Sequence, residues 1–189
     1  MAALVKTSSI TESDCQNKDD FILVLDRVQD PGNLGTLFRT ALAGGVDRIV
    51  LGGGANPLNQ KVLRASCGSL FHLPFYRIEG EEDIVIDKLL SSLKDFSKKG
   101  FQIILTTGQN QVSRIPLKPY WDLDWLRPTV LVLGNEGSGI HEKIKEAFNE
   151  RVTIPHSELV ESLNVACVAV PLLLERKRVT ITTITEHQK

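Results

Sequence analysis

The chain has 189 residues, of which 42% are hydrophobic, and its 22 Lys and Arg residues nearly balance its 23 Asp and Glu residues. This length is typical of one domain with a substantial core. The balanced charge excludes a protein coated in basic surface, such as a histone-like binder. It does not exclude nucleic acid as a partner, because a local basic patch is enough to contact a few phosphates.

The termini and cysteines indicate a compartment. No run of about 18 apolar residues is present, so no membrane span and no membrane partner are expected. Residues 1–20 lack the apolar core of a signal peptide and are interpreted as a flexible leader on a soluble intracellular protein, with the cytoplasm as the expected location. Cys15, Cys67 and Cys167 lack zinc or disulfide spacing, and Cys67 and Cys167 are expected to be buried reduced thiols.

The first predicted elements form a β-α-β unit. Residues 21–25 are wholly apolar, as expected of a strand buried on both faces of a parallel sheet. A helix is predicted next, with Asn33 as its N-cap, and residues 49–51 read as the following buried strand. The apolar positions of that helix are Leu34, Leu37, Phe38, Ala41 and Leu42.

The alternation of strands and helices continues to the end of the chain. Further strands are predicted at residues 70–78, 101–105, 130–133 and 152–154, and further helices at 57–66, 84–96, 140–148 and 162–175. Residues 111–127 fit an ordered surface loop, Pro171 is expected to kink or divide the last helix, and residues 179–185 fit an edge strand or a tail. The predicted fold is an α/β domain with a mostly parallel sheet flanked by helices.

Three loops that follow predicted strands carry unusual residues. They span residues 30–35, 134–139 and 154–164. In open α/β sheets, ligands bind at the carboxyl ends of parallel strands, where such loops lie. Taken singly, each has a plain interpretation: Asn33 or Ser162 caps a helix, and Arg39 lies about 130° from its helix's apolar stripe as a solvated arginine. Neither a G-x-G-x-x-G helix start nor a P-loop is present, which counts against an unrelated nucleotide-binding module.

Taken together, the three loops resemble the motifs of the SpoU/TrmH branch of the SPOUT RNA methyltransferases. The matching segments are DRVQDPGNLGTLFRTA (26–41), LVLGNEGSGI (131–140) and IPHSELVESLNVA (154–166), in the family's order and spacing. The resemblance covers roughly residues 21–178, which implies a methyltransferase domain over that range and a short tail at 179–189. It also implies a C-terminal trefoil knot and a homodimer.

The resemblance implies a function and a set of site residues. Members of this family transfer a methyl group from S-adenosyl-L-methionine (AdoMet), usually to a ribose 2′-hydroxyl of tRNA or rRNA, without a metal. The implied cofactor-binding residues are Thr106, Thr107, Gly108, Leu133, Gly134, Glu136, Ile154, Pro155 and Leu163. The implied catalytic residues are Arg39, Asn33, Glu136, Ser162 and Asn164, with Arg39 orienting the RNA phosphate and ribose.

Two positions depart from the family pattern. His156 and Glu158 stand where relatives commonly carry methionine and glycine. His156 is expected to line or pack against its loop rather than to perform acid–base chemistry. A positive φ at Glu158 would strain the backbone there. These departures leave open an alternative function, a catalytically silent RNA-binding protein of the same fold.

Overall fold

The computed structural model describes residues 19–108 and 115–186. Within these ranges seven strands form one sheet in the order β3-β2-β1-β6-β4-β7-β5, and all neighbouring strands run parallel. The strands are β1 (Phe21–Asp26), β2 (Arg48–Gly52), β3 (Phe75–Ile78), β4 (Gln102–Thr106), β5 (Lys118–Pro119), β6 (Thr129–Leu133) and β7 (Arg151–Thr153). The expected leader, residues 1–20, lies outside the described residues except for Asp19 and Asp20.

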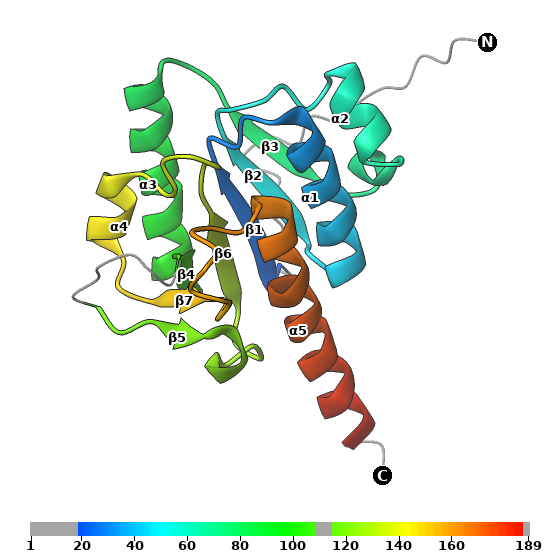
Figure 1. The fold of residues 1–189 in the computed structure, drawn as a ribbon, viewed down its shortest axis with the longest axis vertical. Coiled ribbons are helices and arrows are strands. Elements are labelled where there is room, and N and C mark those ends of the chain that lie inside the picture. The colour runs from blue at the N-terminus through cyan, green and yellow to red at the C-terminus, as the bar shows by residue number, and fades with distance from the viewer. Residues whose placement is uncertain (1–18, 109–114, 187–189) are drawn as a thin grey trace.

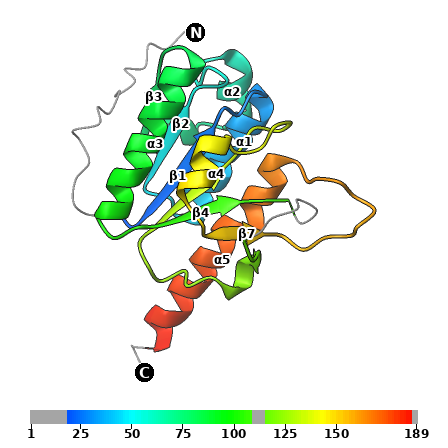
Figure 2. The ribbon, with the colours of Figure 1, turned by 90° about the vertical axis from the view of Figure 1, so that its left-hand side faces the viewer.

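Helices cover both faces of the sheet. They are α1 (Pro31–Gly44), α2 (Gln60–Ala65), α3 (Glu82–Lys98), α4 (Glu142–Ala147) and α5 (Val165–Glu186), with short 3₁₀ turns η2 (Ser69–Phe71) and η3 (Tyr120–Asp122). Figure 1 shows α1, α2 and α5 on one side of the sheet and α3 and α4 on the other. Figure 2 views the molecule from the α3 and α4 side. The predicted α/β architecture with a parallel sheet is confirmed; the trefoil knot stays a prediction.

The central strand β1 shows why the sheet needs helices on both sides. All six of its residues are buried. Phe21, Leu23 and Leu25 belong to the core under α1 and α5, whereas Ile22 and Val24 belong to the core under α3. Successive side chains of a strand point to opposite faces, so a continuous apolar run must be covered twice.

The last helix is longer than the sequence analysis predicts. The edge strand considered for residues 179–185 is wrong, because α5 continues to Glu186 and Pro171 does not divide it, whereas the tail at 179–189 stays a prediction. Each threonine hydroxyl in this stretch donates to the carbonyl oxygen four residues earlier, at 2.9–3.1 Å. The β-branched residues that suggest a strand therefore satisfy their hydroxyls within the helix.

A buried arginine anchors α5 to the amino end of the sheet. Arg176 donates to the carbonyl oxygens of Trp125, Arg127 and Asp20, the last two at 2.9 and 3.0 Å. Its guanidinium lies 4.5 Å from the centre of the Phe21 ring. Burial lowers the pKa of Arg176 from its ordinary value. The charge is kept because several carbonyl oxygens solvate it in place of water.

Other sequence predictions need smaller corrections. Of residues 70–78, predicted as a strand, only Phe75–Ile78 are extended, because the chain first forms η2. Cys67 and Cys167 are exposed free thiols, not buried ones. The predicted loop at 111–127 contains β5 and η3, and residues 111–114 of it lie outside the described residues. No helix in the described part of the chain is long and apolar enough to cross a membrane.

Candidate active site

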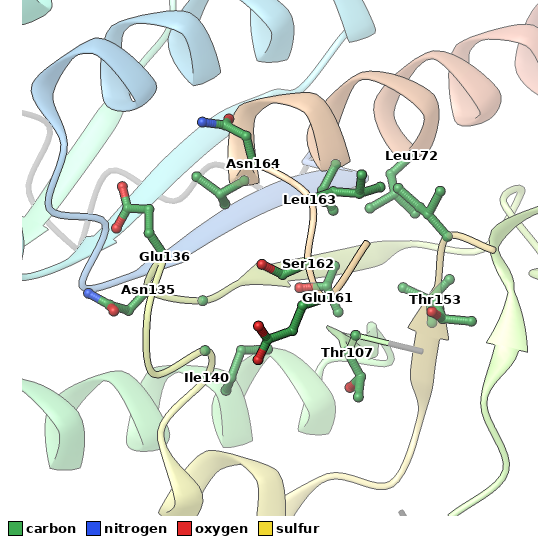
Figure 3. Close-up of a pocket in the computed structure, with 18 of the residues that line it drawn as sticks. Thr107, Asn135, Glu136, Ile140, Thr153, Glu161, Ser162, Leu163, Asn164 and Leu172 are labelled. Carbon is green, nitrogen blue, oxygen red and sulfur yellow. The ribbon is translucent and has the colours of Figure 1, made fainter. Parts of the chain in front are cut away.

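A pocket of about 420 Å³ lies at the carboxyl ends of three neighbouring strands. Residues 106–108 at the end of β4, residues 134–137, 139 and 140 after β6, and residues 152–154 and 156 at the end of β7 form its walls (Figure 3). Residues 161–165 and the first turns of α5 close it. This is the edge at which open parallel sheets bind ligands, and the volume falls in the usual range for small-molecule sites.

The loop after β6 brings its backbone close to the pocket. A Cβ atom at Gly134 would collide with the backbone of Gly139 and Ile140, so only glycine fits this position. Asn135 and Gly139 pair through two backbone hydrogen bonds of 3.0–3.1 Å, and the Asn135 side-chain oxygen accepts from the Gly137 and Ser138 N–H groups. The motif at 134–139 therefore folds into a small closed loop that exposes backbone to the pocket.

Glu136 joins this loop to the loop after β1. Its carboxylate accepts hydrogen bonds from the backbone N–H groups of Gln29 and Asp30 and from the side chain of Asn33, at 3.0–3.1 Å. Burial raises the pKa of Glu136, but these hydrogen bonds outweigh burial and hold the pKa below its ordinary value. Glu136 is therefore ionised at neutral pH and clamps two loops that lie more than a hundred residues apart in sequence.

Asn33 and Asn164 complete the connection between the three motifs. The Asn164 side-chain N–H donates to the Asn33 side-chain oxygen at 3.0 Å. The Asn164 oxygen accepts from the N–H groups of Ala166 and Cys167, so Asn164 caps α5. The structure thus places Glu136, Asn33 and Asn164 in one chain of hydrogen bonds that spans all three loops.

Both helix caps differ from the sequence predictions. Asp30, not Asn33, caps α1, and its side chain accepts from the Asn33 N–H at 2.8 Å. That hydrogen bond and the ammonium of Lys61 lower the pKa of Asp30. Asn164 takes the cap position predicted for Ser162, which instead lines the pocket. The Asn33 side chain can therefore bond to Glu136 and Asn164, and Ser162 can line the pocket.

Arg39 lies outside the pocket. It is exposed on α1, six residues beyond Asn33, and its Nη1 atom donates to the Cys67 sulfur at 3.7 Å. Within the described residues it forms no ion pair with a carboxylate. Its guanidinium is thus able to pair with an anionic group of a substrate, and its catalytic role stays a prediction.

The structure brings most of the predicted cofactor residues together. Those that line the pocket are Thr106, Thr107, Gly108, Gly134, Glu136, Ile154 and Leu163, joined by Ser162 and Asn164 from the predicted catalytic set. Leu133 is buried in β6 and Pro155 is exposed, and neither lines the pocket. Their role as cofactor-binding residues stays a prediction.

The sequence analysis does not predict several of the residues that line the pocket. Val168 and Leu172 form an apolar wall on α5, and Lys145 and Glu161 carry charges to its rim. The spacing of Val168 and Leu172, four residues apart, signals one helical face, but nothing in the sequence says that this face meets the pocket. Figure 3 shows the Glu161 carboxylate directed toward Ile140 across the opening.

The two departures from the family pattern have simple local structures. His156 lines the pocket and its Nδ1 atom lies 2.8 Å from the carbonyl oxygen of Ile154, in its own loop. Glu158 is exposed in a turn, and the positive-φ residues other than glycine in the described chain are Arg27 and Cys67. The backbone at Glu158 is therefore unstrained.

Comparison with known proteins decides the family. Residues 20–174 match the SpoU rRNA Methylase family. The chain belongs to this family. One similar protein is an uncharacterized tRNA/rRNA methyltransferase of Synechocystis, which is 39% identical to this chain over 157 residues. The matched region covers 82% of this chain and 52% of that protein. A 23S rRNA (guanosine(2553)-2′-O)-methyltransferase of Bacillus subtilis is 37% identical over 153 residues. The matched region covers 80% of this chain and 56% of that protein.

Solved SpoU structures share the fold. A SpoU methyltransferase of Streptomyces viridochromogenes, crystallised with AdoMet, matches with a TM-score of 0.75 and 28% identity over 91% of this chain and 65% of that one. An AdoMet-bound rRNA methyltransferase of Sinorhizobium meliloti matches with a TM-score of 0.71 and 29% sequence identity. The match covers 87% of this chain and 59% of that one. The chain spans about half the length of the curated SpoU relatives it matches. The family match also removes the unrelated nucleotide-binding module as an interpretation.

Proposed function

We propose that this chain is the catalytic domain of an AdoMet-dependent methyltransferase that modifies a ribose 2′-hydroxyl of tRNA or rRNA. The observation that carries the proposal is the pocket lined by the second and third SpoU motif loops, to which Asn33 of the first motif is tied by its hydrogen bonds with Glu136 and Asn164. The 2′-O-methyltransferase named among its SpoU relatives supports the reaction, and the AdoMet-bound neighbours support the cofactor.

The lining of the pocket fits AdoMet chemically. Ile154 and Leu163 offer apolar surfaces to the adenine ring, and the closed loop at Gly134 offers backbone groups to polar edges. The hydroxyl oxygens of Thr107 and Thr153 are buried in the pocket wall without a hydrogen-bond partner, so a polar ligand would satisfy them. AdoMet is cationic at its sulfonium and amino groups, which complements the carboxylate of Glu161.

In the proposed reaction, bound AdoMet supplies a methyl group that its sulfonium already activates. Arg39 has two conceivable tasks. Acting as a base would require deprotonation of a group with a pKa of about 12.5, which costs about 7.5 kcal/mol at pH 7. Orienting a phosphate through a bidentate fork carries no such cost. We assign Arg39 to holding the phosphate and ribose and to stabilising the negative charge that develops at O2′.

The remaining polar residues position this arrangement. Asn33 is held by Glu136 and by Asn164, and it lies on the same helix as Arg39. Ser162 lines the pocket beside Leu163. These side chains would fix the distance between the pocket and the ribose, and orientation of this kind contributes much of the acceleration in transfers from activated donors.

Calorimetric titration with AdoMet tests the proposal first. We expect saturable binding of one AdoMet per subunit, lost in Leu163→Arg, whose guanidinium would fill the proposed adenine slot. Leu126→Arg is the matched control, because Leu126 is exposed and lies outside the pocket. Absence of binding to the folded native chain would contradict the proposal and favour the catalytically silent RNA-binding protein. With binding shown, a methylated ribose is identified by the resistance of the RNA to alkaline cleavage at that nucleotide.

We also propose that the protein acts as a homodimer inside the cell, where AdoMet and RNA are both present. Apolar side chains stand exposed on two adjacent helices, at Leu42 on α1 and at Val170, Leu174 and Ile181 on α5. A second copy of the chain would cover them. Light scattering after size-exclusion chromatography is expected to give twice the chain mass, and Leu174→Glu is expected to shift it toward the monomer.

A further inference from the structure

Charge is unevenly distributed along the chain. Residues 31–78 contain five Lys and Arg residues and a single acidic residue, Asp47, although the whole chain has a net charge of −1. This segment spans α1, β2, α2, η2 and β3. Three of its five basic residues have carboxylate partners: Arg48 with Asp19, Lys61 with Asp30 and Arg77 with Glu79.

The two remaining arginines, Arg39 and Arg64, lie on α1 and α2, two helices that pack against each other. The Cys67 sulfur lies 3.7 Å from Arg39 Nη1 and 3.7 Å from the Arg64 carbonyl oxygen, so it bridges α1 and the end of α2. Both arginines are exposed, and neither forms an ion pair within residues 19–108 and 115–186. Their positive charges are therefore left uncompensated on neighbouring elements.

An exposed aromatic ring follows Arg64 in the chain, on the η2 turn that packs against α1. Cys67 and Gly68 both have positive φ, 50° and 84°, and turn the chain from α2 into η2. This turn buries Leu70 in the core and leaves Phe71 49% exposed. α2 and η2 both pack on α1, the helix that carries Arg39 (Figure 1). Arg39, Arg64 and Phe71 are called the α1–α2 surface below.

We propose that the α1–α2 surface binds a single-stranded segment of the substrate RNA, with Arg64 holding a phosphate next to the one held by Arg39 and Phe71 stacking an unpaired base. The choice of RNA rests on the proposed function. Uncompensated arginines attract a polyanion, and exposed aromatic rings stack bases with little regard to sequence. Proteins recognise RNA mainly at such unpaired bases, because the major groove of its duplex is too narrow to read. Arg64 and Phe71 thereby become substrate-positioning residues outside the three motifs.

The test measures RNA binding without cofactor. The probe is fluorescein-labelled single-stranded oligouridylate, followed by fluorescence anisotropy over a series of salt concentrations. Arg64→Gln is expected to weaken binding and to reduce the slope of log affinity against log salt by about 0.7, the value for one phosphate contact on a single strand. Phe71→Ala is expected to weaken binding about fivefold or more with the slope unchanged, and Phe71→Trp to restore it.

Arg127→Gln is the matched control. Arg127 is an exposed arginine before β6, at the opposite end of the strands from the pocket, and this change is expected to leave affinity and slope unaltered. Equal effects of Arg64→Gln and Arg127→Gln would overturn the inference, as would equal loss of duplex and single-stranded binding in Phe71→Ala. A Phe71→Ala chain that binds RNA normally but changes its oligomeric state would assign the surface to a second copy instead.

The outcomes separate this inference from the proposed function. Loss of RNA binding in the variants, with AdoMet binding and thermal stability unchanged, supports the α1–α2 surface. Normal methyl transfer and normal RNA binding by Arg64→Gln and Phe71→Ala would overturn the surface and leave the methyltransferase standing. RNA binding through this surface by a chain that binds no AdoMet would support the surface and contradict the methyltransferase.

Discussion

The two halves of the sheet differ in charge and in their share of the pocket. The half with β1, β2 and β3 carries α1 and α2, an excess of basic residues and an exposed Phe71, and none of its residues lines the pocket. The half with β4, β6 and β7 carries the pocket, whose charged lining includes Glu136 and Glu161. Under the proposed function, separate elements would bind substrate and cofactor, so the hydrogen bonds between the halves would decide whether the two act together.

Arg39→Ala is expected to give the largest effect on function. The change removes the proposed phosphate contact in the basic half, and methyl transfer should fall by about 100- to 1,000-fold, as when one preorganised charge-stabilising donor is lost. AdoMet affinity, measured by calorimetry, should stay within about twofold because Arg39 lies outside the pocket. Loss of AdoMet binding in this variant would break the division between the two halves.

Gly134→Ala is expected to act in the opposite half. The new Cβ would strike the backbone of Gly139 and Ile140, so the loop must shift, at a cost of about 1–3 kcal/mol in stability. AdoMet binding should weaken at least tenfold, whereas binding of single-stranded RNA without cofactor should persist. Thermal unfolding and calorimetry measure the two effects, and Gly108→Ala is the control for stability alone, because a Cβ there meets no described atom within 4 Å although Gly108 itself lines the pocket. Equal losses of stability in the two variants would contradict this account of Gly134.

Asn164→Ala tests the link between the halves. It removes the hydrogen bond to Asn33 and the cap of α5, so unfolding free energy should fall by about 1–2 kcal/mol in chemical denaturation. Asn164→Asp keeps the capping oxygen but loses the N–H that reaches Asn33. It should recover most of the stability but not the rate of methyl transfer, and full recovery of both would show that the link to Asn33 is unimportant.

Glu136→Gln is expected to give the smallest effect and the one that depends on pH. Folding lowers the pKa of Glu136. Its ionised carboxylate therefore stabilises the folded chain fully above the pKa that Glu136 has in the unfolded chain. This stabilisation is lost as pH falls through the lower pKa of the folded chain. At pH 7 the variant should lose about 1 kcal/mol, a value reduced by the partial exposure of the carboxylate. The difference in stability between the two proteins should begin to shrink as pH falls below about 4.3, the pKa of glutamate in an unfolded chain, and should vanish below the lower folded pKa. A difference that stays constant with pH would show that ionisation of Glu136 does not stabilise the fold.

Sequence patterns predicted most of the fold because its strands are buried on both faces. The runs at β1, β4 and β6 are wholly or almost wholly apolar, which indicates a central strand without any knowledge of its neighbours. The pattern failed at residues 179–185, where β-branched residues favour strands in general. There the hydrogen bonds of Arg176 fix the helix against the sheet, and the threonine hydroxyls are satisfied within the helix by the carbonyl oxygens four residues earlier.

The candidate site was predictable in its residues but not in its arrangement. The motifs identified Asn33, Glu136 and Asn164, yet their mutual hydrogen bonds depend on three loops that meet only when the parallel strands align their carboxyl ends. The exposure of Cys67 beside Arg39 is likewise invisible in a sequence that surrounds it with small residues.

By itself, the sequence determined the α/β class, the family and the residues of the three motifs, because apolar periodicity and motif spacing are local properties of the chain. Only the tertiary structure decided which of those residues line the pocket and which, like Asn33, hold its loops together. It also decided that α1, α2 and η2, which carry Arg39, Arg64 and Phe71, pack together. Such contacts join residues distant in the chain, and burial and hydrogen bonding choose among them only once the sheet has assembled.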